Sequence, residues 1–341
     1  MTPTPAPASR GRVLGLLAGG ALGDALGAPF EGQSAVAAAE LTEHEKSGTR
    51  LTHTDDTALA LVLARHLADR RDERGVDGDM LALELAQAWK AEPWRGYGSG
   101  AQHVLGLIEA GVPWSRAARA TFGGQGSYGN GAAMRVAPVA LVATSLHHAA
   151  ELGRRSAEVT HAHEDGQLGA ACLAGAAYLA LHSTPGRRLD VARLLQDLGR
   201  VVRSRSWHQK FDRIGELIRH EVAPGHAARA LGNDVSALGS VPLALLAFLG
   251  RCDEAAETIR YAVLAGGDTD TIASMAGALV GARNGAAAFP ESWTSRLEAT
   301  EQLGRLADQI STASRTRSSG EENHAGSDVV GTQRGAGSGG G

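Results

Sequence analysis

Residues 164–181, EDGQLGAACLAGAAYLAL, indicate which class of fold the chain adopts. Their larger apolar residues recur at spacings of three and four, which places them on one face of a helix: Leu168, Cys172, Ala176 and Leu179. Alanine and glycine occupy many of the other positions, as expected where helices pack closely against one another. The stretch therefore predicts a long helix within a helical core.

The same helical spacing recurs along the chain. Residues 189–202 show it, and residues 241–249 are almost wholly apolar, which predicts a central helix with Pro242 in its first turn. Residues 183–190, 204–210 and 223–235 are less regular and are expected to connect helices. Runs of β-branched and aromatic residues are few, which argues against sheets. We predict an all-α fold, with a single compact multi-helix domain over residues 10–311.

The two ends of the chain differ in composition from this domain. Residues 1–9 are rich in proline and are expected to be disordered, and residues 312–341 read as a flexible tail rich in glycine and serine. Arg10 to Leu26 imitates a signal peptide, but Asp24 favours a buried, glycine-rich helix instead. No apolar run is expected to reach the length of a membrane span. These features predict a cytoplasmic protein without a membrane partner.

The net charge and the two cysteines bear on the binding partners and on the cellular compartment. The 341 residues carry a formal net charge of −4, which argues against direct nucleic-acid binding. The two cysteines, Cys172 and Cys252, are expected to be free thiols in a reducing compartment. We expect the protein to be a monomer.

Two acidic clusters carry the strongest chemical signal. The first is Thr54-Asp55-Asp56-Thr57, and the second is Gly266-Gly267-Asp268-Thr269-Asp270-Thr271. Both precede apolar helical runs, so a helix cap is the simplest interpretation of each. A cap needs only one such side chain, however, and four carboxylates in one place would repel one another unless cations lay between them. The clusters therefore predict a site for two Mg²⁺ ions, with Mn²⁺ as an alternative.

A glycine-rich loop is a second candidate site. Residues 123–135 read GGQGSYGNGAAMR, and such a loop lets a ligand approach the backbone closely. A helix is expected from Met134 onward, and its N-terminus would favour an anion such as a diphosphate. Phe122 and Tyr128 flank the loop and could stack on a base. The alternative is an ordinary glycine-rich turn between two helices.

Three further residues are candidates on weaker grounds. His161 precedes the helix over residues 164–181 and could donate a hydrogen bond to a ligand oxygen. Gly98 lies in a second close-approach loop, Arg95-Gly96-Tyr97-Gly98-Ser99-Gly100. Glu31 ends the run GDALGAPFE, where a lone glutamate would ordinarily be a solvated loop residue.

Together these segments resemble the ADP-ribosylglycohydrolase family over roughly residues 11–290. The matching motifs follow the family's order: Gly23-Asp24, Thr54-Asp55-Asp56, Gly129-Asn130-Gly131 with Met134-Arg135, Thr160-His161, and Gly267-Asp268-Thr269-Asp270-Thr271. Within the family the chain is most similar to the branch that removes ADP-ribose from serine and degrades poly(ADP-ribose). The resemblance implies an orthogonal all-α fold with a dinuclear magnesium centre.

The resemblance also implies roles for individual residues. The metal ligands would be Thr54, Asp55, Asp56, Asp268, Asp270 and Thr271. Glu31 would be the catalytic glutamate, acting beside Asp55 and Asp56. Phe122 and Tyr128 would stack on adenine, with Val235 lining the same pocket. The remaining substrate contacts would come from Gly98, Gln125, Gly126, Ser127, Gly129, Asn130, Gly131 and His161.

The implied activity is magnesium-dependent hydrolysis of the ADP-ribosyl bond at C1″. ADP-ribosylated serine in proteins is the expected substrate, and poly(ADP-ribose) and O-acetyl-ADP-ribose are further ones. Two alternatives stay open at this point. The chain could act on ADP-ribosyl-arginine, like other branches of the family, or it could bind ADP-ribose without catalysis.

Overall fold

The computed structural model describes residues 8–69 and 75–312. Within these ranges the regular structure is helical, and β-pairing is limited to two isolated bridges, Leu51 with Leu297 and Gly129 with Ser236. The predicted all-α fold is therefore confirmed. The segment 1–9 and the tail 312–341 lie almost entirely outside the described residues, so both stay predictions.

The helices follow one another with short connections. In chain order they are α1 (Arg10–Gly27), η1 (Ala28–Phe30), α2 (Ala38–Lys46), α3 (Asp55–Asp69), α4 (Gly78–Ala91), α5 (Ser99–Glu109), α6 (Trp114–Ala117), η2 (Phe122–Gly124), η3 (Ala137–Leu141), α7 (Leu146–Glu158), α8 (Glu164–Leu181), α9 (Val191–Val201), α10 (Arg205–Arg219), α11 (Pro224–Leu231), α12 (Ala237–Gly250), α13 (Ala255–Leu264), α14 (Thr269–Asn284), η4 (Ala286–Ala288) and α15 (Glu291–Thr294), where η denotes a 3₁₀ helix. Residues 300–312 are helical as well.

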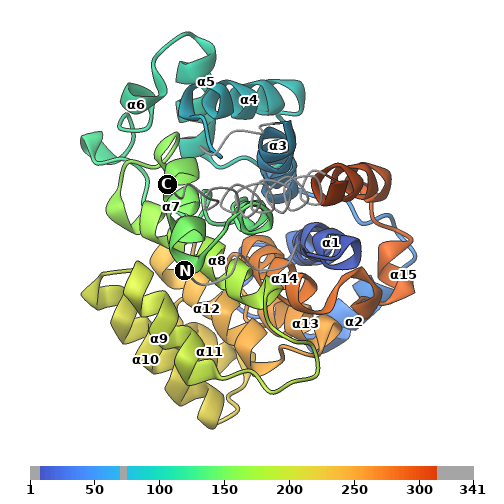
Figure 1. The fold of residues 1–341 in the computed structure, drawn as a ribbon. Coiled ribbons are helices and arrows are strands. Elements are labelled where there is room, and N and C mark those ends of the chain that lie inside the picture. Colours follow the sequence, from blue (N-terminus) through green and yellow to red (C-terminus); the bar gives the residue numbers. More distant parts are fainter. Residues whose placement is uncertain (1–7, 70–74, 313–341) are drawn as a thin grey trace, which may run out of the picture.

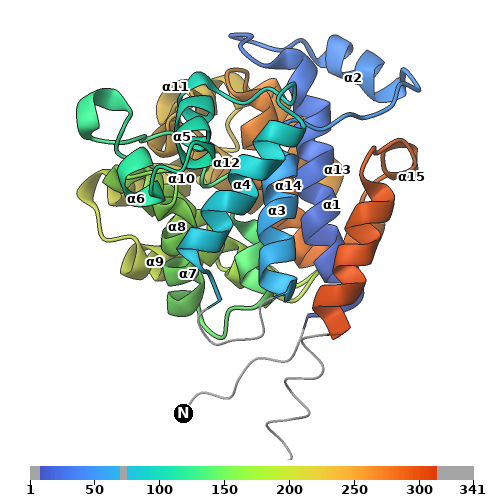
Figure 2. The ribbon, with the colours of Figure 1, turned by 90° about the horizontal axis from the view of Figure 1, so that it is seen from above.

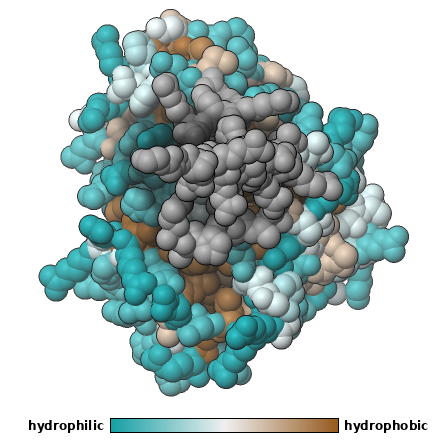
Figure 3. Space-filling model, viewed as in Figure 1, coloured by the Kyte–Doolittle hydropathy of each residue, from teal (hydrophilic) through white to brown (hydrophobic). Residues whose placement is uncertain are grey.

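Helix α14 lies at the centre of the molecule. It packs against α1, α8, α12 and α13, and every residue from Thr269 to Arg283 is buried (Figure 1). Helix α8 spans the predicted residues, and its apolar face joins the same core. On the face drawn in Figure 3, hydrophilic side chains cover most of the described surface, and apolar ones show in smaller patches. The long apolar helices therefore form the inside of a layered helical bundle.

A stripe of glycines lets α1 and α14 touch through their backbones. A Cβ atom on Gly19 would lie 2.2 Å from the carbonyl oxygen of Gly277, and one on Gly23 would lie 2.0 Å from that of Ala273. No side chain fits at such distances. The glycines recur every four residues on one face of α1: Gly15, Gly19, Gly23 and Gly27. The two helices run antiparallel, so the C-terminal end of α1 meets the N-terminal end of α14.

Helix α3 completes this arrangement. Figure 2 shows α1, α3 and α4 side by side, with α2 beyond the C-terminal end of α1. Helices α1, α3 and α14 all contact one another. The first acidic cluster lies at the N-terminal end of α3 and the second at the N-terminal end of α14. The packing of the three helices therefore brings together the two ends of the domain.

The structure corrects three local predictions. Pro242 lies inside α12 rather than in its first turn, because Ser236 Oγ accepts a hydrogen bond from Gly239 N at 3.1 Å and starts the helix at Ala237. Residues 204–210 and 223–235 are not merely connections, since they contain the start of α10 and all of α11. Helix α10 was missed although its apolar residues keep helical spacing and are buried: Trp207, Phe211, Ile214 and Leu217.

The apolar run that contains helix α1 is longer than predicted. The run Arg10–Phe30 is long and apolar enough to cross a membrane by length and composition, contrary to the prediction, because its many alanines and glycines count as apolar. Of its most apolar window, 83% is buried inside the protein. Asp24 lies within this helix and is fully buried. The predicted buried, glycine-rich helix is thus present.

Candidate active site

Asp24 holds the start of α3 against the end of α1. Its buried carboxylate accepts hydrogen bonds from the backbone N–H of Thr54, at 3.0 Å to each oxygen, and of Thr57, at 3.0 Å. The Thr57 hydroxyl donates a further bond of 2.5 Å to Asp24 Oδ2. The residues between these two threonines, Asp55 and Asp56, are therefore fixed in place by a side chain from α1.

A hydrogen bond joins the two acidic clusters. Thr271 Oγ1 donates to Asp56 Oδ2 at 3.2 Å, and Thr54 Oγ1 donates to the same oxygen at 3.3 Å. Asp56 is 1% exposed and Thr271 is 4% exposed. The structure thus brings the early and late clusters into direct contact, as the sequence predicted.

Glu31 lies at the solvent side of this cluster. One carboxylate oxygen of Glu31 and one each of Asp268 and Asp270 lie within 4.8 Å of one another. Glu31 is exposed and follows η1, whereas both aspartates are buried. The next residue, Gly32, donates its N–H to the carbonyl of Gly267 at 2.8 Å. The loop that carries Glu31 is therefore anchored to the second cluster.

Burial and mutual repulsion disfavour the ionised form of these carboxyl groups. Burial, and then the nearby Asp24, raise the pKa of Asp55 to about 7. Burial, and then Asp268, raise the pKa of Asp270 to about 9. Burial together with Asp270 holds the pKa of Asp56 well above its ordinary value, and the pKa of Glu31 is raised by burial and by Asp268. The cluster therefore releases its protons reluctantly when no cation balances it.

The donor set suits hard divalent cations. Every side chain that the two clusters offer is a carboxylate or a hydroxyl, which are ligands that Mg²⁺ and Mn²⁺ prefer. Asp56 Oδ1 is buried and has no hydrogen-bond partner among the described residues, so this oxygen is available to a cation. The side chain of Asp268 makes no capping hydrogen bond at the start of α14. Helix capping therefore does not account for the second cluster, and the residues fit divalent cations.

Phe122, Tyr128 and Val235 form an exposed apolar surface. Their exposed fractions are 53%, 41% and 64%, and the two ring centroids lie 4.7 Å apart. Val235 is brought there because Ala237 N donates to Tyr128 O at 3.0 Å. Phe122 has a φ of +48°, a left-handed conformation that is uncommon for a bulky residue and marks a strained position. This surface could stack on a planar ring.

Asn130 connects the glycine-rich loop to the second acidic cluster. Its backbone N–H donates to Val235 O at 2.9 Å. Its side-chain Nδ2 donates to Asp268 Oδ2 at 2.5 Å and to Ser240 Oγ at 2.9 Å. Asn130 was predicted as a substrate contact, but the amide N–H groups are engaged inside the protein. In the structure its side chain supports Asp268.

The other predicted contacts from the loop lie around this connection. Gln125 is exposed, and Ser127 Oγ accepts a hydrogen bond from Gly129 N at 3.1 Å. Gly126 has a φ of +80°, and a Cβ there would lie 2.8 Å from Ala162 N, so only glycine fits. Gly98 is the exposed residue that precedes α5.

The helix expected from Met134 onward does not form. Asn130 O accepts the N–H of Met134 at 3.0 Å and closes a single turn. The chain then continues as the short 3₁₀ helix η3, because Pro138 offers no N–H to an α-helix. The helix N-terminus that was predicted to favour a diphosphate after this loop is therefore absent from residues 134–141.

His161 lies beneath the loop glycines. A Cβ on Gly131 would lie 3.5 Å from His161 Nε2, and one on Gly129 would lie 4.0 Å from the same atom. On the other side of the ring, Nδ1 is 2.8 Å from Thr160 Oγ1. Burial and the neighbouring Arg135 lower the pKa of His161 to about 3, so the imidazole is neutral at physiological pH.

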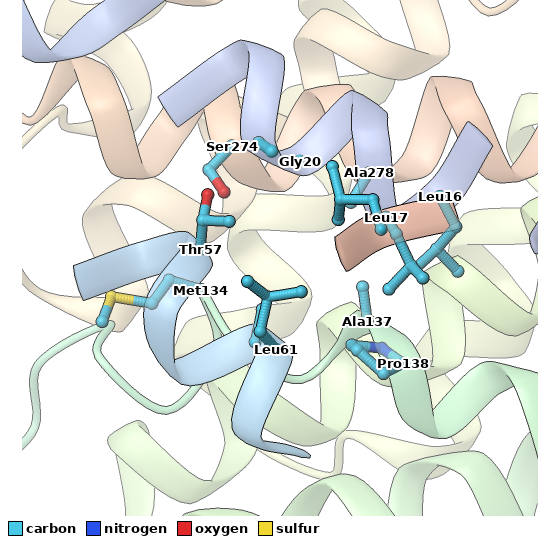
Figure 4. A pocket seen from close by; sticks show the side chains of 13 residues that line it. Leu16, Leu17, Gly20, Thr57, Leu61, Met134, Ala137, Pro138, Ser274 and Ala278 are labelled. Carbon is cyan, nitrogen blue, oxygen red and sulfur yellow. The ribbon is translucent and has the colours of Figure 1, made fainter. Parts of the chain in front are cut away.

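A small internal cavity lies behind the acidic clusters. Its volume is about 20 Å³, and its walls come from α1, α3, η3 and α14 (Figure 4). Thr57 and Ser274 are polar members of a lining that is otherwise mostly apolar, with Leu16, Leu17 and Leu61 among its larger side chains. A cavity of this size has room for about one water molecule. It is too small for a nucleotide, so it is not itself an ADP-ribose site.

Comparison with known proteins agrees with this geometry. Residues 5–320 match the model of the ADP-ribosylglycohydrolase family. The chain belongs to this family. Among its relatives, ADP-ribosylhydrolase ARH3 from Mus musculus is 35% identical over 88% of this chain and 90% of its own length, and the Homo sapiens protein of the same name is 35% identical over 89% and 93%. The predicted family resemblance, including its branch, is therefore confirmed.

The fold of this ADP-ribosylglycohydrolase family member also matches a solved structure. A chain titled "ADP-ribosylglycohydrolase-related protein complex" superposes with a TM-score of 0.69 at 28% identity. The match covers 89% of this chain and 98% of the other. The helical arrangement described above is thus that of the family over nearly the whole domain.

Several residues that shape the site were missed or left without a role in the sequence analysis. Asp24 appeared there only as part of a motif, although its side chain positions Thr54 and Thr57. Asn233 was not singled out, yet its carbonyl accepts the N–H of Asp268 at 2.8 Å. An ionisable residue inside an apolar glycine-rich helix was a usable signal for Asp24. Nothing in the sequence signalled Asn233, because its contribution is a backbone carbonyl.

Proposed function

We propose that this chain is a magnesium-dependent hydrolase that cleaves the ADP-ribosyl bond at C1″, with ADP-ribosylated serine in proteins as its substrate. The contact between Thr271 and Asp56 carries the proposal, because it assembles one oxygen-rich site from both acidic clusters. The name of the ARH3 relatives, ADP-ribosylhydrolase, supports the reaction class.

The order of the described surfaces supports ADP-ribose as the ligand. Adenine would stack on the exposed surface formed by Phe122, Tyr128 and Val235. The diphosphate would lie along the glycine-rich loop, within reach of His161. The distal ribose would then meet the acidic clusters, which are joined to the loop through the bond from Asn130 to Asp268.

Cleavage of a glycosidic bond passes through a transition state that resembles an oxocarbenium ion. Bound magnesium would neutralise the carboxylates and polarise and orient the ribose hydroxyls. Asp55, Asp56, Asp268 and Asp270, with Thr54 and Thr271, would hold the ions. Glu31 is the carboxyl group at the solvent side of this set, and burial, the main cause of its raised pKa, favours the protonated form. Glu31 would give its proton to the departing serine oxygen as the C1″–O bond breaks. A water molecule would then add to C1″ and return a proton to the Glu31 carboxylate.

Hydrolysis of a serine-ADP-ribosylated peptide tests the proposal. We expect release of ADP-ribose in the presence of magnesium and none after chelation with EDTA. The variant Asp270→Asn should be inactive under both conditions, because it removes one carboxylate from the cluster. Full activity in a thoroughly chelated sample would refute the metal dependence.

The competing substrates are separated by the same measurement. An arginine-linked peptide, poly(ADP-ribose) and O-acetyl-ADP-ribose should be compared with the serine-linked peptide at equal concentration. Preferential cleavage of the arginine linkage would replace serine in the proposal. Magnesium-dependent binding of ADP-ribose without cleavage of any of these substrates would instead indicate a binding protein.

A further inference from the structure

Arg135 is a buried cation without a carboxylate partner. It is 1% exposed, and its hydrogen bonds within the described residues go to uncharged oxygens: Gly131 O at 2.9 Å, Ser156 O at 2.9 Å and Thr160 Oγ1 at 2.8 Å. Its Nε is buried and has no partner among those residues. Burial lowers the pKa of Arg135 to about 10, so the guanidinium still carries its charge at neutral pH. Burying a charge without a charged partner costs folding free energy. The position of Arg135 therefore needs a reason other than stability.

The bond to Gly131 places this charge directly beneath the glycine-rich loop. The loop does not continue directly into an α-helix. The N-terminal end of α8 lies against it, since a Cβ on Gly166 would lie 2.8 Å from Ser127 O. The acidic clusters would be balanced by their own cations under the proposed function. The Asp55 carboxylate acts on Arg135 through space but makes no hydrogen bond to it. A ligand diphosphate on the loop would be a second anion close to the guanidinium, and attraction between the two would be weakly screened in so buried a place.

The same guanidinium also fixes the protonation of His161. Thr160 Oγ1 accepts a hydrogen bond from Arg135 Nη2, and it lies 2.8 Å from His161 Nδ1. The hydroxyl hydrogen of the buried Thr160 has one partner in the described structure, namely Nδ1 as an acceptor. The neutral imidazole must then carry its hydrogen on Nε2. That atom lies under Gly129 and Gly131, on the side of the loop.

We infer that Arg135 and Thr160 are positioning residues of a diphosphate subsite, in which the buried guanidinium supplies the positive charge and holds His161 as an Nε2–H donor to a ligand oxygen. This inference rests on the proposed function, which names ADP-ribose as the ligand and supplies the cations that balance the acidic clusters. The relay from Arg135 through Thr160 to His161 is a property of the free protein and can be tested without activity.

The first experiment measures the tautomer of His161. Nitrogen-15 NMR of the ligand-free protein should show hydrogen on Nε2 and a bare Nδ1, and the signal should be assigned with a His161→Gln variant. In Thr160→Val the preference for Nε2–H should be lost or weakened, because Nδ1 no longer receives a hydrogen bond. A wild-type protein with hydrogen on Nδ1 would overturn the relay, whatever the substrate turns out to be.

The second experiment measures binding by calorimetry, with ADP-ribose and with Mg²⁺ as separate probes. Thr160→Val should weaken ADP-ribose binding about tenfold, as expected for one lost hydrogen bond in a buried network. Its affinity for Mg²⁺ should stay at the wild-type value, since the acidic clusters are untouched. Unchanged ADP-ribose affinity would contradict the inference. No binding of ADP-ribose to the wild type would instead contradict the proposed function, and the NMR result would still decide the relay.

Matched variants show whether an effect on ADP-ribose affinity comes from the position of His161, from loss of folding or from loss of the Arg135 charge. Thr258→Val makes the same substitution at another buried threonine, whose hydroxyl donates to Arg251 O at 2.9 Å, and it should leave ADP-ribose affinity unchanged. Arg135→Lys keeps the positive charge but loses the planar set of guanidinium N–H donors. It should therefore bind ADP-ribose more tightly than Arg135→Met at low salt. Folding of both variants should be verified by circular dichroism. Equal affinities of the two for ADP-ribose would show that the Arg135 charge does not attract the diphosphate.

Discussion

Thr271 Oγ1 lies 3.2 Å from Asp56 Oδ2, across 215 residues of sequence. Each residue lies in the first turn of its helix, so the bond ties the N-terminal ends of α3 and α14 together. Asp24 secures the same place from α1 through Thr54 and Thr57. The acidic site therefore lies where the ends of three packed helices meet, which suits a site that must hold repelling carboxylates at fixed positions.

The stability of the metal-free protein should fall as pH rises. The pKa of Asp55 is raised to about 7 and that of Asp270 to about 9 in the folded protein, above the ordinary value of 3.8. Through these two groups the folded state binds more protons than the unfolded state between pH 3.8 and about 9. Above pH 6.5 the histidines with lowered pKa are neutral in both states and no longer oppose this effect, so the unfolding free energy decreases from about pH 7 to about 9. Saturating Mg²⁺ should reduce this loss by balancing the carboxylates.

Differential scanning calorimetry at a series of pH values, with EDTA and with Mg²⁺, measures this effect. Asp270→Asn is the matched variant, because it removes one titrating group and should flatten the decline in melting temperature without metal. It should also lose most of the stabilisation by Mg²⁺. A metal-free wild type that gains stability toward pH 9 would contradict the electrostatic account of the cluster.

Glu31→Gln should abolish turnover while leaving magnesium-dependent ADP-ribose binding largely intact. Glutamine keeps the size of the side chain but cannot exchange a proton, and Glu31 is exposed, so folding should be unaffected. Turnover and calorimetric binding should be measured on the same preparation. Glu40→Gln in α2 is the control, since Glu40 is also exposed and should retain activity. Wild-type turnover in Glu31→Gln would end the catalytic role of this residue.

Phe122→Ala and Tyr128→Ala should each reduce the affinity for ADP-ribose more than they reduce kcat. Stacking of a base on an aromatic side chain contributes about 1–3 kcal/mol, so ADP-ribose affinity should fall about 5- to 150-fold. The Michaelis constant should rise by a similar factor while kcat changes little. Leu83→Ala is the comparison, because Leu83 is 48% exposed on α4 and outside the proposed site. A large loss of kcat with unchanged binding would argue against an adenine surface here.

Gly19→Ala should destabilise the protein strongly, and Gly20→Ala should not. A Cβ on Gly19 would lie 2.2 Å from Gly277 O, whereas one on Gly20 would meet its nearest atom, the Cβ of Ala278, at 3.6 Å. Overpacking at the first position should cost about 1–3 kcal/mol or more, since two backbones must separate. At the second position, removal of a helical glycine should be neutral or stabilising by about 0.5–1 kcal/mol.

Urea unfolding of the two variants makes this comparison at neighbouring residues of one helix. The midpoint should drop for Gly19→Ala and stay or rise for Gly20→Ala. Similar midpoints in both variants would show that α1 can move away from α14 at little cost, and the close contact would then not be needed for stability.

The sequence predicted the acidic clusters because they are short, contiguous and richer in charge than a helix cap requires. It also predicted α8, since the period of its apolar residues is local information. It did not predict how the loop at Asn130 meets Val235, because that backbone pairing joins segments about a hundred residues apart. The expected helix after Met134 failed for the same reason: contacts to residues outside the stretch, together with Pro138, set the local conformation.

Helices α1 and α14 lie at opposite ends of the domain in sequence, yet their backbones touch along the glycine stripe. During synthesis on the ribosome, α1 cannot pack against α14 until almost the entire domain has been synthesised. Truncated products lacking α14 would leave α1 with an uncovered apolar face, exposed to chaperones and proteases. Premature termination should therefore yield material that is cleared by the cell instead of a partly active enzyme.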